Sequence, residues 1–206
     1  MGAQLAQMGM GVADTVMAGR YGSEDLAGVA LGSSILWPTL ILFMGVIQAV
    51  TPTVSQLNGS RSYSEIGEVI RQGIWMALFG GAAIFFILNN IGPVYELMRV
   101  DPVAVAIALP YLSMASYGLP ALMIFFCLRF LSDGMGYTRP ALIISVTALA
   151  IKIPMNYVLI YGKFGLPELG GVGCGVAQAI VMWLQLFLIL IVVSRERFAP
   201  TNWKSQ

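Results

Sequence analysis

The chain has 206 residues, of which 58% are hydrophobic and only 10% are charged. A soluble domain carries roughly 25% charged residues, so 11 basic and 10 acidic side chains are too few to cover a water-exposed surface. The net charge of +1 argues against a nucleic-acid partner, and the absence of histidine excludes any catalytic or metal site built on imidazole.

Six apolar segments follow one another along the chain, at residues 1–19, 26–57, 70–94, 102–130, 139–161 and 170–194. A helix needs about 20 apolar residues to cross the hydrocarbon core of a bilayer, whereas a barrel strand needs only about 10. The segments are too long for barrel strands and lack their strict alternation, so each predicts a transmembrane helix. The connections are short and polar, which favours antiparallel neighbours within a single membrane domain.

The first segment contains a carboxylate, Asp14. An acid at the centre of a membrane helix costs about 2.5–3.5 kcal/mol on insertion scales, so such groups usually face the bundle interior or a water-filled cavity. An acid in that position could exchange a proton or a Na⁺ ion. The alternative is a solvated acid at the helix end, because Arg20 follows closely in the sequence.

Uncharged polar residues and methionines within the segments suggest a ligand cavity. Gln48 and Gln178 could bond a ligand, although hydrogen bonds between helices are the commoner role of such amides. Methionines such as Met17 and Met44 could line an adaptable pocket for hydrophobic ligands, or could simply pack. Gln48, Gln178, Tyr157 and Met17 are therefore our candidates for a substrate cavity.

Small residues within the segments indicate helix packing. The glycine pairs at positions 28 and 32 and at positions 171 and 175 have the spacing that lets two membrane helices approach closely. Cys127 and Cys174 each lie in an apolar stretch, so we expect small buried hydrophobic residues rather than a disulfide or metal ligands.

The fifth segment carries a second polar pair. Lys152 and Asn156 are four residues apart and therefore share one helix face, and Pro154 between them frees a backbone carbonyl. A buried lysine needs a counter-charge, and Asp14 is the only acid within another segment. The alternative, an ammonium group that reaches the membrane interface, is difficult from near mid-membrane, about ten residues before Tyr161.

An even number of spans places both termini on the same side of the membrane. The basic residues sort into two groups: Arg61, Arg71, Arg129, Arg139, Arg195, Arg197 and Lys204 on the side of the termini, and Arg20, Arg99 and Lys163 opposite. The positive-inside rule therefore predicts that both termini are cytoplasmic.

Three extended motifs occur in order along the chain: MGVADTVMAGRYGSEDLAGVALGSS, then AVTPTVSQLNGS with a following VIRQG, then KIPMNYVLIYGKFGLPELGGVGCGVAQAIVMW. They closely resemble the NorM-type branch of the multidrug and toxic compound extrusion (MATE) transporters, over nearly the whole chain. The resemblance implies an all-α integral membrane protein of the bacterial inner membrane, whose six helices form one lobe of a twelve-helix transporter. Such transporters export amphipathic cationic drugs in exchange for Na⁺ or H⁺.

Matched residue by residue, Asp14 resembles the first-helix acid implicated in cation or proton coupling. Asn156 resembles the second of two polar residues near that acid on the fifth helix. Lys152 occupies the first of those positions, where many relatives have Asn, so its ammonium group is expected to compete with Na⁺ for Asp14. The coupling ion is left open between Na⁺ and H⁺, a metal would bind at Asp14 only if that ion is Na⁺, and no cofactor is expected.

The resemblance also implies that the C-terminal lobe is missing and that the first helix is truncated. The expected partners are membrane lipid, the drugs, and either the missing lobe or a second copy of the chain. One alternative is a non-transporting membrane fragment or accessory subunit that only associates with other helices. A flippase for lipid-linked precursors would call for a more basic cavity, and an enzyme is not expected because no nucleophile, base and orienting group can be assembled.

Overall fold

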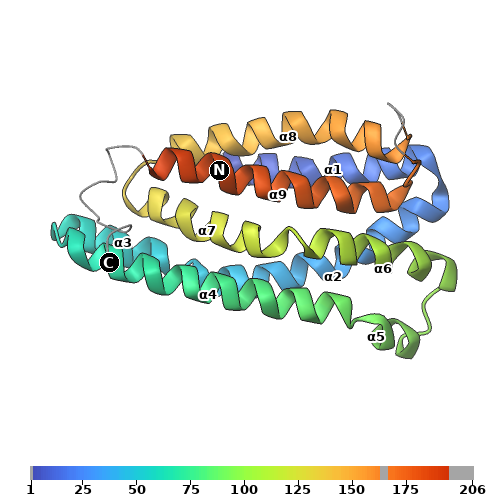
Figure 1. Ribbon diagram of the computed structural model, residues 1–206, viewed down its shortest axis with the longest axis horizontal. Coiled ribbons are helices and arrows are strands. Elements are labelled where there is room, and N and C mark those ends of the chain that lie inside the picture. The colour runs from blue at the N-terminus through green and yellow to red at the C-terminus, as the bar shows by residue number, and fades with distance from the viewer. Residues whose placement is uncertain (1, 163–166, 195–206) are drawn as a thin grey trace.

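The computed structural model describes residues 2–162 and 167–194, and the regular elements within these ranges are all helices. In chain order they are α1 (Gly2–Tyr21), α2 (Ser23–Ile47), α3 (Val50–Gly59), α4 (Tyr63–Asn89), α5 (Gly92–Leu97), α6 (Pro102–Ser116), α7 (Leu119–Gly134), α8 (Arg139–Ile160) and α9 (Gly171–Val193). The long helices lie side by side along one common direction (Figure 1). The predicted all-α fold is confirmed.

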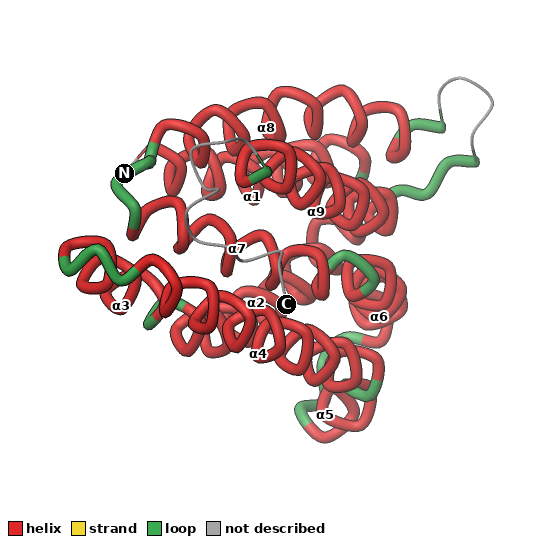
Figure 2. Tube along the Cα trace, turned by 60° about the vertical axis from the view of Figure 1, so that its left-hand side comes forward, coloured by secondary structure: helices red, strands yellow, loops and turns green. Residues whose placement is uncertain are grey.

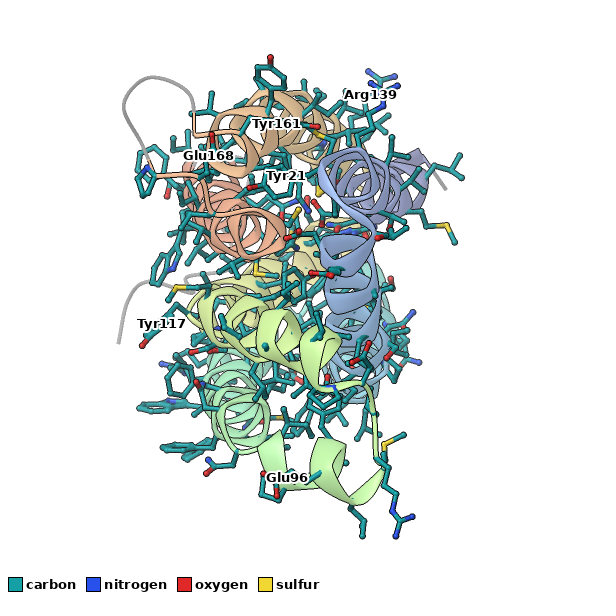
Figure 3. All side chains as sticks on the ribbon, turned by 90° about the vertical axis from the view of Figure 1, so that its right-hand side faces the viewer. Tyr21, Glu96, Tyr117, Arg139, Tyr161 and Glu168 are labelled. Atoms are coloured by element: carbon teal, nitrogen blue, oxygen red, sulfur yellow. The ribbon has the colours of Figure 1, made fainter. Side chains whose placement is uncertain are left out.

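The bundle has α7 at its centre. Helices α1, α8 and α9 lie on one side of it and α2, α3 and α4 on the other (Figures 1 and 2). Phe125, Leu128 and Leu131 of α7 are fully buried and belong to the main apolar core. Because α1 packs beside α8 and α9, polar side chains of these three helices can meet although they are far apart in the sequence.

In the described part of the chain, four of the predicted membrane helices have the length and apolar content of a membrane span, and the bent pair α6–α7 makes a fifth if it is counted as one span. The four lie at Ser23–Gly59, which combines α2 and α3, and at Tyr63–Asn89, Arg139–Ile160 and Gly171–Val193. The first predicted segment is helical as α1, but it does not reach the same hydropathy. Polar residues of α1 such as Gln7, Asp14 and Arg20 lower its hydropathy.

The segment at 102–130, expected as one helix, is broken into α6 and α7, which meet at an angle of 52°. Pro120 lies in the first turn of α7, where the missing N–H of a proline is tolerated. A Cβ on Gly118 would lie 2.8 Å from the Cα of Ala179, so glycine is what lets the bend touch α9. The Tyr117 carbonyl at the bend accepts a hydrogen bond from the Trp183 indole N–H at 3.2 Å.

Helix boundaries also differ from the sequence ranges around α3 and α4. A turn at positions 48–49 separates α2 from α3 within the expected segment 26–57. Helix α4 begins at Tyr63, in a polar stretch that was expected to be a connection, and Glu65 in its first turn favours that helix start. It ends at Asn89, whose amide donates to the Phe85 carbonyl at 2.9 Å, and the short α5 follows.

The predicted role of the glycine pairs is confirmed. A Cβ on Gly32 of α2 would lie 2.5 Å from the Tyr111 ring of α6, and a Cβ on Gly175 of α9 would lie 2.5 Å from the Tyr111 carbonyl oxygen. Both helices therefore approach α6 more closely than any larger residue would allow. Cys127 and Cys174 are free and buried, as expected.

The two groups of basic residues lie at opposite ends of the bundle, as far as the structure describes them. The α3–α4 connection, with Arg61, and the start of α8, at Arg139, lie at one end, and α5 and the end of α1, at Arg20, lie at the other (Figure 1). Lys163, Arg195, Arg197 and Lys204 lie outside the described residues. Which end faces the cytoplasm stays a prediction.

Candidate functional site

Asp14 lies on the inward face of α1. Met10, Asp14 and Ala18 are spaced four residues apart and are all buried, and the side chain of Asp14 has an exposed fraction of only 6%. Val12 and Val16 point outward on the opposite face. The period of the helix therefore turns the carboxylate into the bundle rather than toward solvent at the helix end.

Two donors from α8 bind the two oxygens of this carboxylate. Lys152 Nζ lies 2.7 Å from Asp14 Oδ2, and Asn156 Nδ2 lies 2.7 Å from Asp14 Oδ1. Both α8 side chains are fully buried. The lysine therefore meets the counter-charge that its burial requires, and its ammonium group does not extend to the membrane interface.

Helix α9 completes the arrangement. Gln178 Oε1 accepts a second hydrogen bond from Lys152 Nζ. One turn earlier, Cys174 Sγ lies 3.9 Å from the backbone carbonyl oxygen of Asp14. We call Asp14, Lys152, Asn156 and Gln178 the Asp14 cluster; it joins three helices and, with the acid and the lysine both ionised, carries no net charge.

One polar atom of the Asp14 cluster has no partner among the described residues. The amide oxygen of Asn156 is buried and accepts no hydrogen bond. A buried polar atom without a partner costs about 1–3 kcal/mol, so this oxygen is ready to accept a proton donor or a cation. The chemistry of the cluster is thus that of binding and charge exchange.

A cavity of about 610 Å³ lies on the other side of α1, between α1, α2 and α7. Its walls are mainly apolar and include Met8, Val12, Trp37, Met44 and Phe126. Concave sites with apolar walls and a few polar groups are the usual binding places for small molecules.

Helix α1 separates the cavity from the Asp14 cluster. Gly11 and Thr15 line the cavity, whereas Asp14 between them points away from it toward α8. Arg129 of α7 also lines the cavity, and its Nε lies 3.8 Å from Asp133 Oδ2. A change in the position of α1 would therefore alter the cluster and the cavity together.

The four candidates for a substrate cavity do not lie together. Gln178 belongs to the Asp14 cluster, and Gln48 is exposed at the turn between α2 and α3. Tyr157 is half exposed and packs its ring 5.1 Å from that of Tyr161. Met17 is partly buried against the main core. Within the described part of the chain, none of these four lines the 610 Å³ cavity, although Met44 does.

The family model described as MatE matches residues 1–158, which is most of the chain. The chain belongs to the MATE family. Multidrug resistance protein MdtK of Yersinia pestis (strain Pestoides F) is 43% identical over 213 residues, which cover 98% of this chain and 47% of that protein. MdtK of Yersinia pseudotuberculosis serotype O:1b matches with the same values. The chain thus spans about half the length of these MATE relatives.

Solved MATE structures share the fold. The crystal structure of the eukaryotic MATE transporter AtDTX14 superposes with a TM-score of 0.91 at 19% identity, covering 100% of this chain and 45% of that one. A MATE crystal structure in the straight conformation gives a TM-score of 0.88 at 19% identity, with the same coverage. The predicted resemblance to MATE transporters, with the chain forming about half of one, is confirmed.

Sequence reasoning missed most of the residues that line the 610 Å³ cavity, including Gln7, Trp37 and Phe126. One signal was present: Trp37, Leu40, Ile41 and Met44 follow helical spacing and form one side of α2 that also lines the cavity. Periodicity alone does not tell a cavity wall from a core or lipid-facing stripe. The opposing walls on α1 and α7 become apparent only in three dimensions.

Proposed function

We propose that the chain is the N-terminal half of a cation-coupled multidrug exporter of the NorM type. In this proposal Asp14, with Asn156 and Lys152, forms the coupling site, and the substrates are amphipathic cationic drugs. The full transporter would rock its two halves around a central cavity and open that cavity to one side of the membrane at a time.

The observation that carries the proposal is a buried, charge-neutral Asp14 cluster that only α1 separates from an apolar cavity. Charged groups inside a membrane bundle are costly and usually belong to ion or substrate pathways. A change in the charge of Asp14 would alter its bonds to α8 and so favour a different position of α1. Because α1 also forms a cavity wall, drug binding and ion binding would be linked.

A second lobe is the proposed partner of an exposed apolar face. Leu5, Met8 and Val12 of α1 have exposed fractions of 68%, 66% and 61%, and Ile41 of α2 beside them has 57%. Met8, Val12 and Ile41 also line the cavity, so the face and the cavity are continuous. We propose that a second six-helix lobe, or a second copy of this chain, covers this face and closes the cavity, while lipid covers the other apolar surfaces.

The proposed location is the inner membrane of a bacterium, with several passes and both termini in the cytoplasm. The two relatives named above come from Yersinia. The α3–α4 connection, with Arg61, and the end of α1, at Arg20, lie at opposite ends of the bundle (Figure 1). More of the basic residues of the sequence belong to the end that we propose to be cytoplasmic.

Ethidium accumulation in a bacterium that lacks its own efflux pumps tests this function. We expect cells with the chain and a C-terminal MATE half to accumulate less dye than cells with that half alone. The variant Asp14→Asn should abolish the difference. The matched control is Glu65→Gln, because Glu65 is an exposed acid of α4, and it should leave efflux unchanged.

The rival function is a membrane fragment or accessory subunit that does not transport. This rival predicts that the chain inserts into the membrane but does not change dye accumulation, whether it is expressed alone or with a C-terminal MATE half. Efflux by the 206-residue chain alone would instead indicate that two copies assemble into a transporter.

A further inference from the structure

The buried ammonium group of Lys152 is held the way a bound cation would be. It lies 2.7 Å from Asp14 Oδ2 and also bonds Gln178 Oε1, and the side chains of both Lys152 and Asp14 are almost fully buried. A carboxylate oxygen and an amide oxygen are also typical ligands of hard cations such as alkali ions. The ammonium group of Lys152 therefore occupies the position in which a free cation would bind Asp14 Oδ2 and Gln178 Oε1.

The oxygen ligands at this position are already bound to the ammonium group. Asp14 supplies the negative charge, and Lys152 neutralises it. Among the described residues, Tyr111 of α6 and Cys174 of α9 also interact electrostatically with Asp14. Among the described residues there is no group of three or more His, Cys, Asp or Glu that could hold a metal ion. An incoming Na⁺ would have to take these oxygen ligands from the ammonium, whereas a proton needs only one lone pair of the carboxylate.

Lys152 also has the advantage of being tethered. Its backbone belongs to α8, so its ammonium competes with Na⁺ at a high effective concentration and loses no translational freedom on binding. Asn156, one turn further along, holds the other carboxylate oxygen at 2.7 Å. The pair is thus preorganised on one rigid helix.

We propose that Lys152 is a built-in cation that excludes Na⁺ from the Asp14 site, so that this half of the transporter exchanges protons instead. This inference rests on the proposed coupling role of Asp14. In the proton step, one H⁺ from water binds a carboxylate oxygen of Asp14, no other covalent bond changes, and the net charge of the Asp14 cluster rises from 0 to +1. The ammonium group of Lys152 then still donates to Gln178 Oε1. The Asn156 amide oxygen, which has no other partner among the described residues, can accept the new O–H of Asp14 after the amide group rotates by 180°.

Binding of radioactive Na⁺ to the purified 206-residue chain in detergent tests the proposal without any transport measurement. We expect no saturable Na⁺ binding by the wild-type chain. Lys152→Asn removes the ammonium and supplies an amide oxygen, so this variant should gain one saturable Na⁺ site per chain. Adding Asp14→Asn to Lys152→Asn should remove that site again, and Lys152→Arg, which keeps the positive charge, should not bind Na⁺.

Saturable Na⁺ binding by the wild-type chain that Asp14→Asn abolishes would overturn the inference. Failure of a folded Lys152→Asn variant to bind Na⁺ would overturn it as well, and Lys152→Gln serves as the same test if the first variant does not fold. These results are separate from efflux. Loss of the proposed transport function would appear in the ethidium experiment, whereas a wrong role for Lys152 would appear only in Na⁺ binding.

Discussion

Lys152 of α8 and Asp14 of α1 are 138 residues apart in the sequence, yet their charged groups meet at 2.7 Å inside the bundle. The contact joins the first helix of the chain to a helix near its end. Each oxygen of the carboxylate has its own donor, because Asn156 bonds the second one at 2.7 Å. The pair thus contributes to the fold as well as to the proposed coupling.

The ion pair makes a first prediction about stability. Asp14→Asn should lower the free energy of unfolding by about 3–5 kcal/mol, because it leaves the buried Lys152 ammonium without a counter-charge. The double variant Asp14→Asn/Lys152→Met should recover most of that loss, since no uncompensated charge remains. Unfolding of the purified chain by SDS in mixed micelles measures both effects.

The second ion pair of the described structure is the control for this experiment. Arg129 and Asp133 are four residues apart on α7 at 3.8 Å, and their side chains have exposed fractions of 11% and 24%. A partly exposed pair at this distance contributes about 0–1 kcal/mol, so Asp133→Asn should be much milder than Asp14→Asn. Equal losses in the two variants would contradict the importance of the buried pair.

A second prediction concerns glycine at the crossing of α9 and α6. Gly175→Ala should destabilise the protein by about 1–3 kcal/mol, because the new Cβ would lie 2.5 Å from the backbone oxygen of Tyr111 and the helices must move apart. Gly45→Ala in α2 is the matched control. No atom lies within 4 Å of a Cβ added at position 45, and alanine forms helices better than glycine does. The stability of the Gly45→Ala protein should therefore be unchanged or slightly raised. Thermal unfolding in detergent separates the two.

The cavity makes a third prediction. Trp37→Ala should weaken the apparent affinity for an aromatic cationic dye by about two- to tenfold, the range expected for loss of an aromatic contact. Trp75 of α4 is 64% exposed and does not line the cavity, so Trp75→Ala should leave dye affinity unchanged. Dye titration by fluorescence anisotropy provides the measurement. A similar loss in both variants would show that the dye binds elsewhere.

The orientation of the bundle gives a fourth prediction. Ser60→Cys, at the end of α3, should react with a membrane-impermeant maleimide only after the cells are opened, whereas Met98→Cys, after α5, should react in intact cells. Both positions are exposed, and the native Cys127 and Cys174 are buried, so the background should be low. The opposite labelling pattern would reverse the proposed topology.

The coupling residues could be identified from the sequence because charge is rare in it. Asp14 is the only charged residue within residues 1–19 and Lys152 the only one within residues 140–161, and a buried lysine requires an acid. The contact itself followed from that requirement. Gln178 was identified only as one of several amides, because an uncharged polar residue in a membrane helix has many possible partners.

The break between α6 and α7 and the start of α4 at Tyr63 could not be predicted from the sequence. Pro120 and Gly118 are compatible with a bend, but a proline in a membrane helix does not always break it. The bend forms because Gly118 packs against Ala179 and Trp183 bonds the Tyr117 carbonyl, and both partners belong to α9.

By itself, the sequence determined that the protein lies in a membrane and that its fold is all-α. It has too few charges to cover a water-exposed surface, its apolar segments have the length of membrane helices, and its motifs are those of the MATE family. The sequence also determined which charged groups must meet, since an isolated charge in a bilayer is costly. Only the tertiary structure decided that Gln178 joins that pair and that α1 lies between the pair and an apolar cavity. The reason is that desolvation acts on each residue locally, whereas a cavity wall exists only where helices from distant parts of the chain pack together.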